Sequence, residues 1–195
     1  MKHLLALALS LTVMSCEATV APHYTAHTVV IPQASRIIPV AIDIQFSPAE
    51  QRQLEQALQE WNKSFNGQMQ FSVYTNHFNM EDSTISYIYN AGGLMLLSVS
   101  KLGNVMMNLD DGTVAITSHV GTGHEIYFLK EKVGLDRMKK VALHELGHAL
   151  GAYHTPTGLM QHVYNAEAYS CIDYTTVQQV AQYQHLNAET MNWCQ

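Results

Sequence analysis

The segment from His144 to His154 constrains this 195-residue chain more than any other, because it sets three histidines at fixed intervals around a glycine. His144 and His148 are four residues apart in a stretch whose apolar residues repeat with a helical period. On an α-helix, residues four positions apart point in the same direction, offset by only about 40°. Gly151 can adopt the left-handed conformation that ends the helix and reverses the chain. The reversal would bring His154 to the other two histidines.

Three imidazoles in this arrangement are a suitable ligand set for zinc. Zinc binds imidazole nitrogen at about 2.0–2.1 Å, and three protein ligands leave the fourth position for water, which is typical of a catalytic site. Glu145 lies beside His144 at the edge of the same helix face, where it can deprotonate the zinc-bound water and later protonate a leaving amine. We therefore expect one catalytic Zn2+ held by His144, His148 and His154, with Glu145 as the general base.

The stretch His-Glu-x-x-His-x-x-Gly-x-x-His, from His144 to His154, resembles the signature of the metzincin zinc peptidases. Metzincins also have a methionine turn beneath the metal, and Met160 is the residue here that matches it. Within the family, the zinc helix is most similar to that of the matrixin-type peptidases. Residues 113–116 and 123–128 resemble the fourth and fifth strands of matrixins.

The region after the third histidine departs from the family pattern. Only five residues separate His154 from Met160, which leaves a reduced substrate-pocket loop. Gln161 and His162 follow the methionine, without the tyrosine that astacins and serralysins place two residues on. Tyr164 is a candidate substitute for that tyrosine, and a plain surface tyrosine is the alternative.

The N-terminus has the features of an export signal. Residues 4–13 are an uncharged apolar run, shorter than the roughly 20 residues that span a bilayer but typical of a signal peptide. Residues 13–16, Val-Met-Ser-Cys, resemble a bacterial lipobox, which would make Cys16 the lipidated first residue of the mature protein. Ordinary cleavage near Ala18 or Ala21 is the alternative. We expect an exported membrane lipoprotein of the cell envelope, or otherwise a periplasmic or extracellular protein.

Export also determines what the other two cysteines can do. With Cys16 acylated, Cys171 and Cys194 remain as an even pair in an oxidising compartment. We expect a disulfide between them that contributes on the order of 3 kcal/mol. Two free thiols packed as small apolar side chains are the alternative.

The periodicity of the chain predicts a single α+β domain. Alternation from Ile38 to Ile44 indicates a strand with its even positions inward, and residues 47–50, Ser-Pro-Ala-Glu, are typical of a helix start. Further strands are expected at 69–74, 84–89, 113–118 and 124–129, and further helices at about 136–151 and 175–193. Residues 91–103 are expected to be a loop region that contains an apolar stretch of no assigned structure. With the family resemblance, this order implies a zincin-like fold: a mixed, twisted sheet of about five strands with an N-terminal helix, a zinc-site helix and a C-terminal helix.

Composition excludes other classes of protein. A chain that is 47% hydrophobic and 13% charged is not intrinsically disordered. With 16 Asp and Glu against 10 Lys and Arg, it lacks the cationic excess that a nucleic-acid partner requires.

These features predict a signal peptide at 1–15, a lipidated N-terminus and tether at 16–35, and a metzincin-like catalytic domain at 36–195. The expected activity is that of a zinc metalloendopeptidase. The resemblance implies a peptide or protein substrate lying extended and antiparallel to the strand at 113–118. Two rivals stay open: a catalytically idle binding or assembly module stabilised by zinc, and a zinc amidase acting on cell-wall peptide. Glu145 argues against the idle module, because a structural zinc site does not need that carboxylate.

Overall fold

The computed structural model describes residues 36–78, 84–100, 112–162 and 170–194. The predicted signal peptide at 1–15, Cys16 with the tether to residue 35, and Tyr164 lie outside these ranges. Within the described part of the chain, no helix combines the length and the apolar character needed to cross a membrane.

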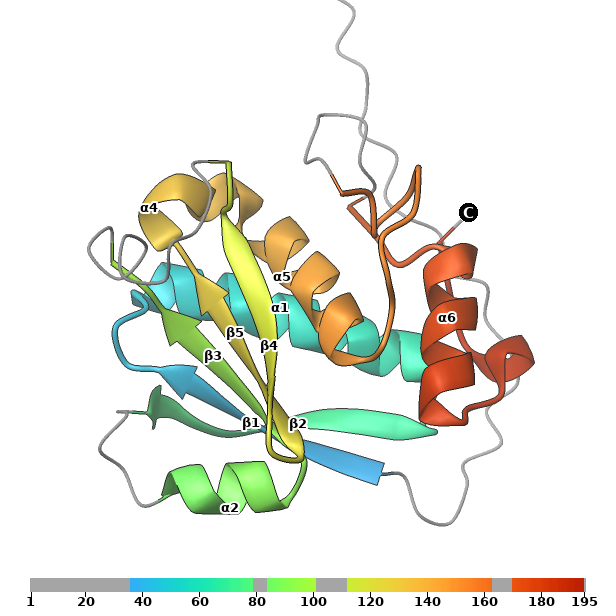
Figure 1. The fold of residues 1–195 in the computed structure, drawn as a ribbon, viewed down its shortest axis with the longest axis horizontal. Helices are drawn as coiled ribbons and strands as arrows, with labels where there is room; N and C mark the ends of the chain where they lie inside the picture. The colour runs from blue at the N-terminus through green and yellow to red at the C-terminus, as the bar shows by residue number, and fades with distance from the viewer. Residues whose placement is uncertain (1–35, 79–83, 101–111, 163–169, 195) are drawn as a thin grey trace, which may run out of the picture.

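A five-stranded mixed sheet forms the centre of the domain, in the order β2-β1-β3-β5-β4 (Figure 1). Neighbours in this order pair in parallel, except that β4 runs antiparallel to β5 and forms one edge. The predicted α+β class with a five-stranded mixed sheet is therefore confirmed. The strands are β1 (Arg36–Asp43), β2 (Met69–Phe78), β3 (Leu94–Ser98), β4 (Ala115–Val120) and β5 (Gly123–Phe128).

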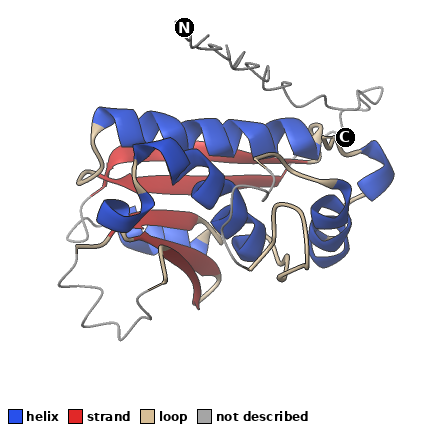
Figure 2. Cartoon of the chain, turned by 90° about the horizontal axis from the view of Figure 1, so that it is seen from above, coloured by secondary structure: helices blue, strands red, loops and turns tan. Residues whose placement is uncertain are grey.

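Helices cover both faces of this sheet (Figures 1 and 2). The long α1 (Pro48–Phe65) and α5 (Leu135–Ala149) lie side by side on one face, and the short α2 (Thr84–Asn90) lies on the other. The smaller elements α4 (Lys130–Val133), α6 (Tyr174–Gln184) and the 3-10 turn η1 (Ala188–Thr190) complete the described fold. The N-terminal helix and the histidine-bearing helix thus form where the sequence predicts them.

The start of α1 follows from its capping residues. The Ser47 hydroxyl accepts from the Glu50 backbone N–H at 3.4 Å, and the Glu50 carboxylate accepts from the Ser47 N–H at 2.7 Å. This reciprocal capping box satisfies two backbone donors at the helix start. Further along α1, the fully buried Trp61 donates from Nε1 to the Leu143 carbonyl at 3.2 Å. Because Leu143 precedes the first histidine of α5, this bond helps to fix the helix that carries the site.

One predicted strand is wrong. Residues 84–89 form the helix α2, with Ile85, Ile88 and Tyr89 at helical spacing against a small core on the far face of the sheet. The strand in this part of the chain is β3, which lies within 91–103, so the loop expected there is also wrong. Residues 94–97 of β3 are all buried, and a parallel strand covered on both faces has no alternation to detect.

Several boundaries also differ from the prediction. β2 extends to Phe78 instead of ending at residue 74, and β4 runs over Ala115–Val120 instead of 113–118. β1 ends at Asp43, its residues 38–43 are buried on both faces, and Ile44, expected inward, is 54% exposed. The last helix was expected to reach residue 193, but α6 ends at Gln184 because His185 adopts a left-handed conformation with φ of +57°. The predicted pair Cys171 and Cys194 is joined by a disulfide, with a Cα–Cα distance of 6.2 Å.

Candidate metal centre

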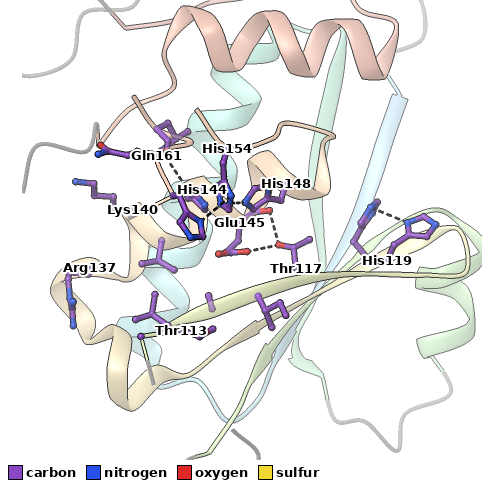
Figure 3. Close-up of a pocket in the computed structure, with 18 residues that line it drawn as sticks. Thr113, Thr117, His119, Arg137, Lys140, His144, Glu145, His148, His154 and Gln161 are labelled. Carbon is purple, nitrogen blue, oxygen red and sulfur yellow. Dashed lines mark hydrogen bonds between the residues drawn. The ribbon is translucent and has the colours of Figure 1, made fainter. Parts of the chain in front are cut away.

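The last two turns of α5 present His144 and His148 side by side, with ring centroids 4.8 Å apart. After the helix the chain reverses and brings in His154, whose ring centroid is 4.6 Å from that of His148 and 5.4 Å from that of His144 (Figure 3). One nitrogen from each ring can be chosen so that all three lie within 4.8 Å of one another. The helical spacing and the chain reversal thus gather the three predicted histidines in one place.

Gly151 makes the reversal possible for two separate reasons. Its φ of +94° lies in the region that disfavours residues with a side chain, as the sequence predicted. In addition, a Cβ at this position would lie only 2.1 Å from Cγ of Tyr183 on α6. The approach to His154 therefore requires glycine here, both for the backbone conformation and for the close contact with α6.

Backbone carbonyls determine which nitrogen of each helical histidine carries its proton. Nδ1 of His144 is 2.8 Å from the Leu159 carbonyl oxygen, and Nδ1 of His148 is 2.9 Å from that of Ala152. A carbonyl can only accept, so each Nδ1 is the donor and each Nε2 keeps an unprotonated lone pair. Both Nε2 atoms are thereby prepared as metal ligands, in the way that outer hydrogen bonds usually orient metal-binding histidines.

The donor set fits a zinc ion. In a tetrahedral site with bonds of about 2.0–2.1 Å, ligand nitrogens are roughly 3.4 Å apart. Nε2 of His148 and Nε2 of His154 are 3.1 Å apart. Burial lowers the pKa of all three histidines, that of His144 to about 4, even though the bond to Leu159 opposes the shift. The neutral imidazole that binds a metal is therefore the favoured form.

Met160 packs directly beneath this part of α5. The residue is fully buried, and a Cβ built at Gly147 would lie 2.5 Å from its sulfur atom. Gly147 stands next to His148 in α5, so Met160 packs against the turn of the helix that carries this histidine. The Thr155 backbone N–H donates to the Met160 carbonyl at 2.9 Å and closes the short loop that follows His154.

Glu145 points from α5 toward the edge strand β4. Only 7% of it is exposed, and the Thr117 hydroxyl lies 2.7 Å from its Oε2 (Figure 3). Burial raises the pKa of Glu145 to about 7, and the hydrogen bond from Thr117 opposes that rise. A carboxyl group with a pKa near neutrality can both take up and release a proton at physiological pH.

A cavity of about 850 Å³ lies between β4 and α5, and the histidines and Glu145 line it (Figure 3). Residues 112–117, which lead into and along β4, form one side of its wall. The three histidines and Glu145 line it together with Arg137, Lys140 and Val141 of α5 and with Leu159, Gln161 and His162. Because β4 is an edge strand of the sheet, the cavity runs beside a strand that can accept a further strand. The predicted strand at 113–118 thus borders the site, although its regular part starts at Ala115.

Sequence reasoning missed two contacts of this site. Thr117 falls on the predicted strand at 113–118, but no local pattern links it to its partner Glu145, which is 28 residues away. In the sequence, His162 is only a departure from the family pattern, yet its Nδ1 lies 3.2 Å from Nδ1 of His154. A second histidine pair, His119 and His124, faces across the β4–β5 hairpin at 3.2 Å and also borders the cavity.

No protein-family model and no curated protein matches this chain. Among solved structures, it is similar to High choriolytic enzyme 1, a hatching enzyme zinc-protease from Oryzias latipes (Medaka fish), with 22% sequence identity and a TM-score of 0.38. The match covers 63% of this chain and 46% of that one, so less than half of the hatching enzyme is matched.

Proposed function

We propose that this protein is an exported zinc-dependent metalloendopeptidase of the metzincin type. The observation that carries the proposal is the convergence of three histidine nitrogens beside a buried carboxyl group, Glu145, at the wall of an 850 Å³ cavity. Metal ligands alone would serve a structural site equally well. A carboxyl group beside them, buried and facing the same cavity, supports hydrolysis.

In the proposed mechanism, each residue of the site has a separate role in peptide hydrolysis. Zinc bound by the three histidines would supply a Lewis acid that polarises the peptide carbonyl and makes a water molecule more acidic. Glu145 accepts a proton from the attacking water and donates it to the nitrogen of the leaving amine. The Thr117 hydroxyl holds Oε2, so the other carboxylate oxygen is left to face the water.

The substrate we propose is a peptide in extended conformation. β4 is an edge strand along the cavity, and an extended peptide can pair with such an edge through main-chain hydrogen bonds while its side chains enter pockets. An antiparallel orientation, as in the matrixin-type peptidases, is part of the proposal.

We further propose that Cys16 is lipidated and that residues 16–35 tether the domain to a membrane of the cell envelope. The disulfide between Cys171 and Cys194 supports export, because disulfides are rare in reducing cytosol. Metabolic labelling with a fatty acid should mark the wild type and not Cys16→Ala. An unlabelled, soluble wild type would contradict the anchor, and N-terminal mass spectrometry would then locate the cleavage near Ala18 or Ala21.

The test of the enzymatic proposal combines metal analysis with cleavage of a proteome-derived peptide library. The purified protein should contain one zinc per chain and cut peptides. A chelator should abolish cleavage, and added zinc should restore it. A zinc-loaded protein that cuts no peptide would contradict the proposal: release of cell-wall peptide would then indicate the amidase, and no hydrolysis at all the binding module.

A further inference from the structure

The three candidate ligands differ in what holds the ring nitrogen that faces away from the metal. In His144 and His148 that nitrogen donates to a main-chain carbonyl, of Leu159 and Ala152 respectively. In His154 the outer nitrogen instead faces a side chain, Nδ1 of His162 at 3.2 Å, with the ring centroids 4.5 Å apart. The outer nitrogen of the third candidate ligand therefore contacts a side chain, which a substitution can remove.

His154 also depends on such a partner more than the other two histidines do. His144 and His148 are half-buried on a helix that is packed against α1, so their backbone and much of their surface are fixed. His154 is exposed and lies outside any helix or strand, after the reversal at Gly151. Its ring lies against the rings of His144, His148 and His162. An outer hydrogen bond is a further means of orienting it.

His162 stands on a segment that is itself firmly placed. Leu159 donates its backbone N–H to the buried Asp173 carboxylate at 2.8 Å, and Met160 is fully buried beneath α5. The same four residues, 159–162, thus support two ligands: the Leu159 carbonyl accepts from His144, and His162 contacts His154.

We propose that His162 is a positioning residue that orients His154 toward the metal. The position of the proton on each ring determines which nitrogen donates and which accepts. To bind zinc through Nε2, His154 must carry its proton on Nδ1, so Nδ1 of His162 must be the acceptor and its Nε2 must carry the proton. This inference rests on the proposed function, because zinc is what His154 would hold.

The test compares the zinc affinity of three variants with that of the wild type, measured by competition with a chromophoric chelator. His162→Ala should bind zinc roughly 10–100-fold more weakly, the usual cost of losing an outer partner of a metal ligand. His162→Asn places an amide oxygen near the position of Nδ1 and should restore most of the affinity. His77→Ala, which removes an exposed histidine from β2 at the opposite edge of the sheet, should bind like the wild type.

Thermal unfolding of the metal-free proteins separates positioning from folding, because the exposed His162 should not affect their Tm. Wild-type zinc affinity in His162→Ala would overturn the inference and leave the proposed enzyme intact. Equal losses of zinc affinity in His162→Ala and His162→Asn would also overturn the inference, and would indicate that His162 binds the metal directly. A wild type that binds no zinc would refute the proposed function itself, and the positioning role with it.

Discussion

At the scale of the single residue, Glu145 separates an enzyme from a zinc-binding module. Glu145→Gln keeps the shape of the side chain and an oxygen that can accept from Thr117, but it removes the group that takes a proton from water. We expect kcat/KM for peptide cleavage to fall by at least about 100-fold, the lower range of general-base catalysis, with zinc content unchanged. Glu55→Gln, a substitution on α1, is the matched control. Equal cleavage by Glu145→Gln and the wild type would refute the role of this carboxylate.

The three histidines are tested by metal content. Replacing His144, His148 or His154 by alanine removes one of three protein ligands, so each variant should lose most of its single zinc ion while His77→Ala keeps it. Mass spectrometry of the native proteins measures the number of zinc ions per chain directly. If all three alanine variants keep a full zinc ion, the metal lies elsewhere.

The residues of the centre that could be predicted are those linked by local geometry. A four-residue interval on a helix brings His144 and His148 together whatever the rest of the chain does, and a glycine with positive φ then brings in His154. The contact between Thr117 and Glu145 joins β4 to α5 across 28 residues. It depends on how a strand and a helix pack, which no short pattern encodes.

At the scale of the element, the junction between α5 and the third ligand depends on Gly151. Gly151→Ala combines an unfavourable φ of +94° with a Cβ placed 2.1 Å from Tyr183 Cγ. We expect the free energy of unfolding to fall by roughly 1–3 kcal/mol in urea titrations. Adding Tyr183→Ala, at a side chain that is 59% exposed, should recover only part of the loss due to the clash, because the Cβ of residue 183 would still lie 2.7 Å away, and none of the part due to the backbone. An unchanged free energy of unfolding in Gly151→Ala would show that the backbone between α5 and His154 can adopt another conformation at no cost.

In the proposed mechanism, the edge strand β4 acts through the Thr117 hydroxyl, which donates to Glu145. Thr117→Val keeps the volume and the strand preference of the side chain but leaves Oε2 of the buried Glu145 without this donor. A hydrogen bond of about 1–1.5 kcal/mol corresponds to a fall of roughly 10-fold in kcat/KM. Thr117→Ser retains the hydroxyl and should cleave peptides nearly as well as the wild type. If the valine variant is as active as the serine variant, the hydroxyl does not orient the carboxylate.

Elements could be predicted where one face is buried and the other exposed. The apolar stripe and capping box of α1 and the histidine spacing of α5 gave correct positions for both helices. β3 gave no such signal, because all of its residues from 94 to 97 are buried. In α2, β-branched and aromatic side chains favour a strand. In the structure, Ile88 is buried and Ile85 partly buried against the far face of the sheet, three positions apart on one side of a helix.

At the scale of the whole molecule, the C-terminal region supports the metal centre from outside. The Asp173 carboxylate accepts from the Leu159 N–H at 2.8 Å and from the Thr176 N–H at 3.0 Å, which joins the start of α6 to the segment that holds Met160. The Cys171–Cys194 disulfide begins two residues before Asp173, and the Cys194 N–H donates to the Ile172 carbonyl at 3.0 Å. A chain of contacts thus runs from the disulfide through Asp173 and Leu159 to His144.

This chain of contacts predicts that the disulfide supports both stability and metal binding. Its cysteines are 23 positions apart, a loop for which chain entropy gives a stabilisation of about 3 kcal/mol. In urea titrations, the free energy of unfolding of the Cys171→Ser, Cys194→Ser double variant should be lower by about that amount. The double variant should also bind zinc more weakly, because Asp173 then holds Leu159 less firmly. A reducing agent should lower the stability of the wild type and leave that of the double variant unchanged. If the double variant loses stability but keeps wild-type zinc affinity, the metal centre is held by α5 and its buried neighbours alone, and the disulfide serves only to close the C-terminal region.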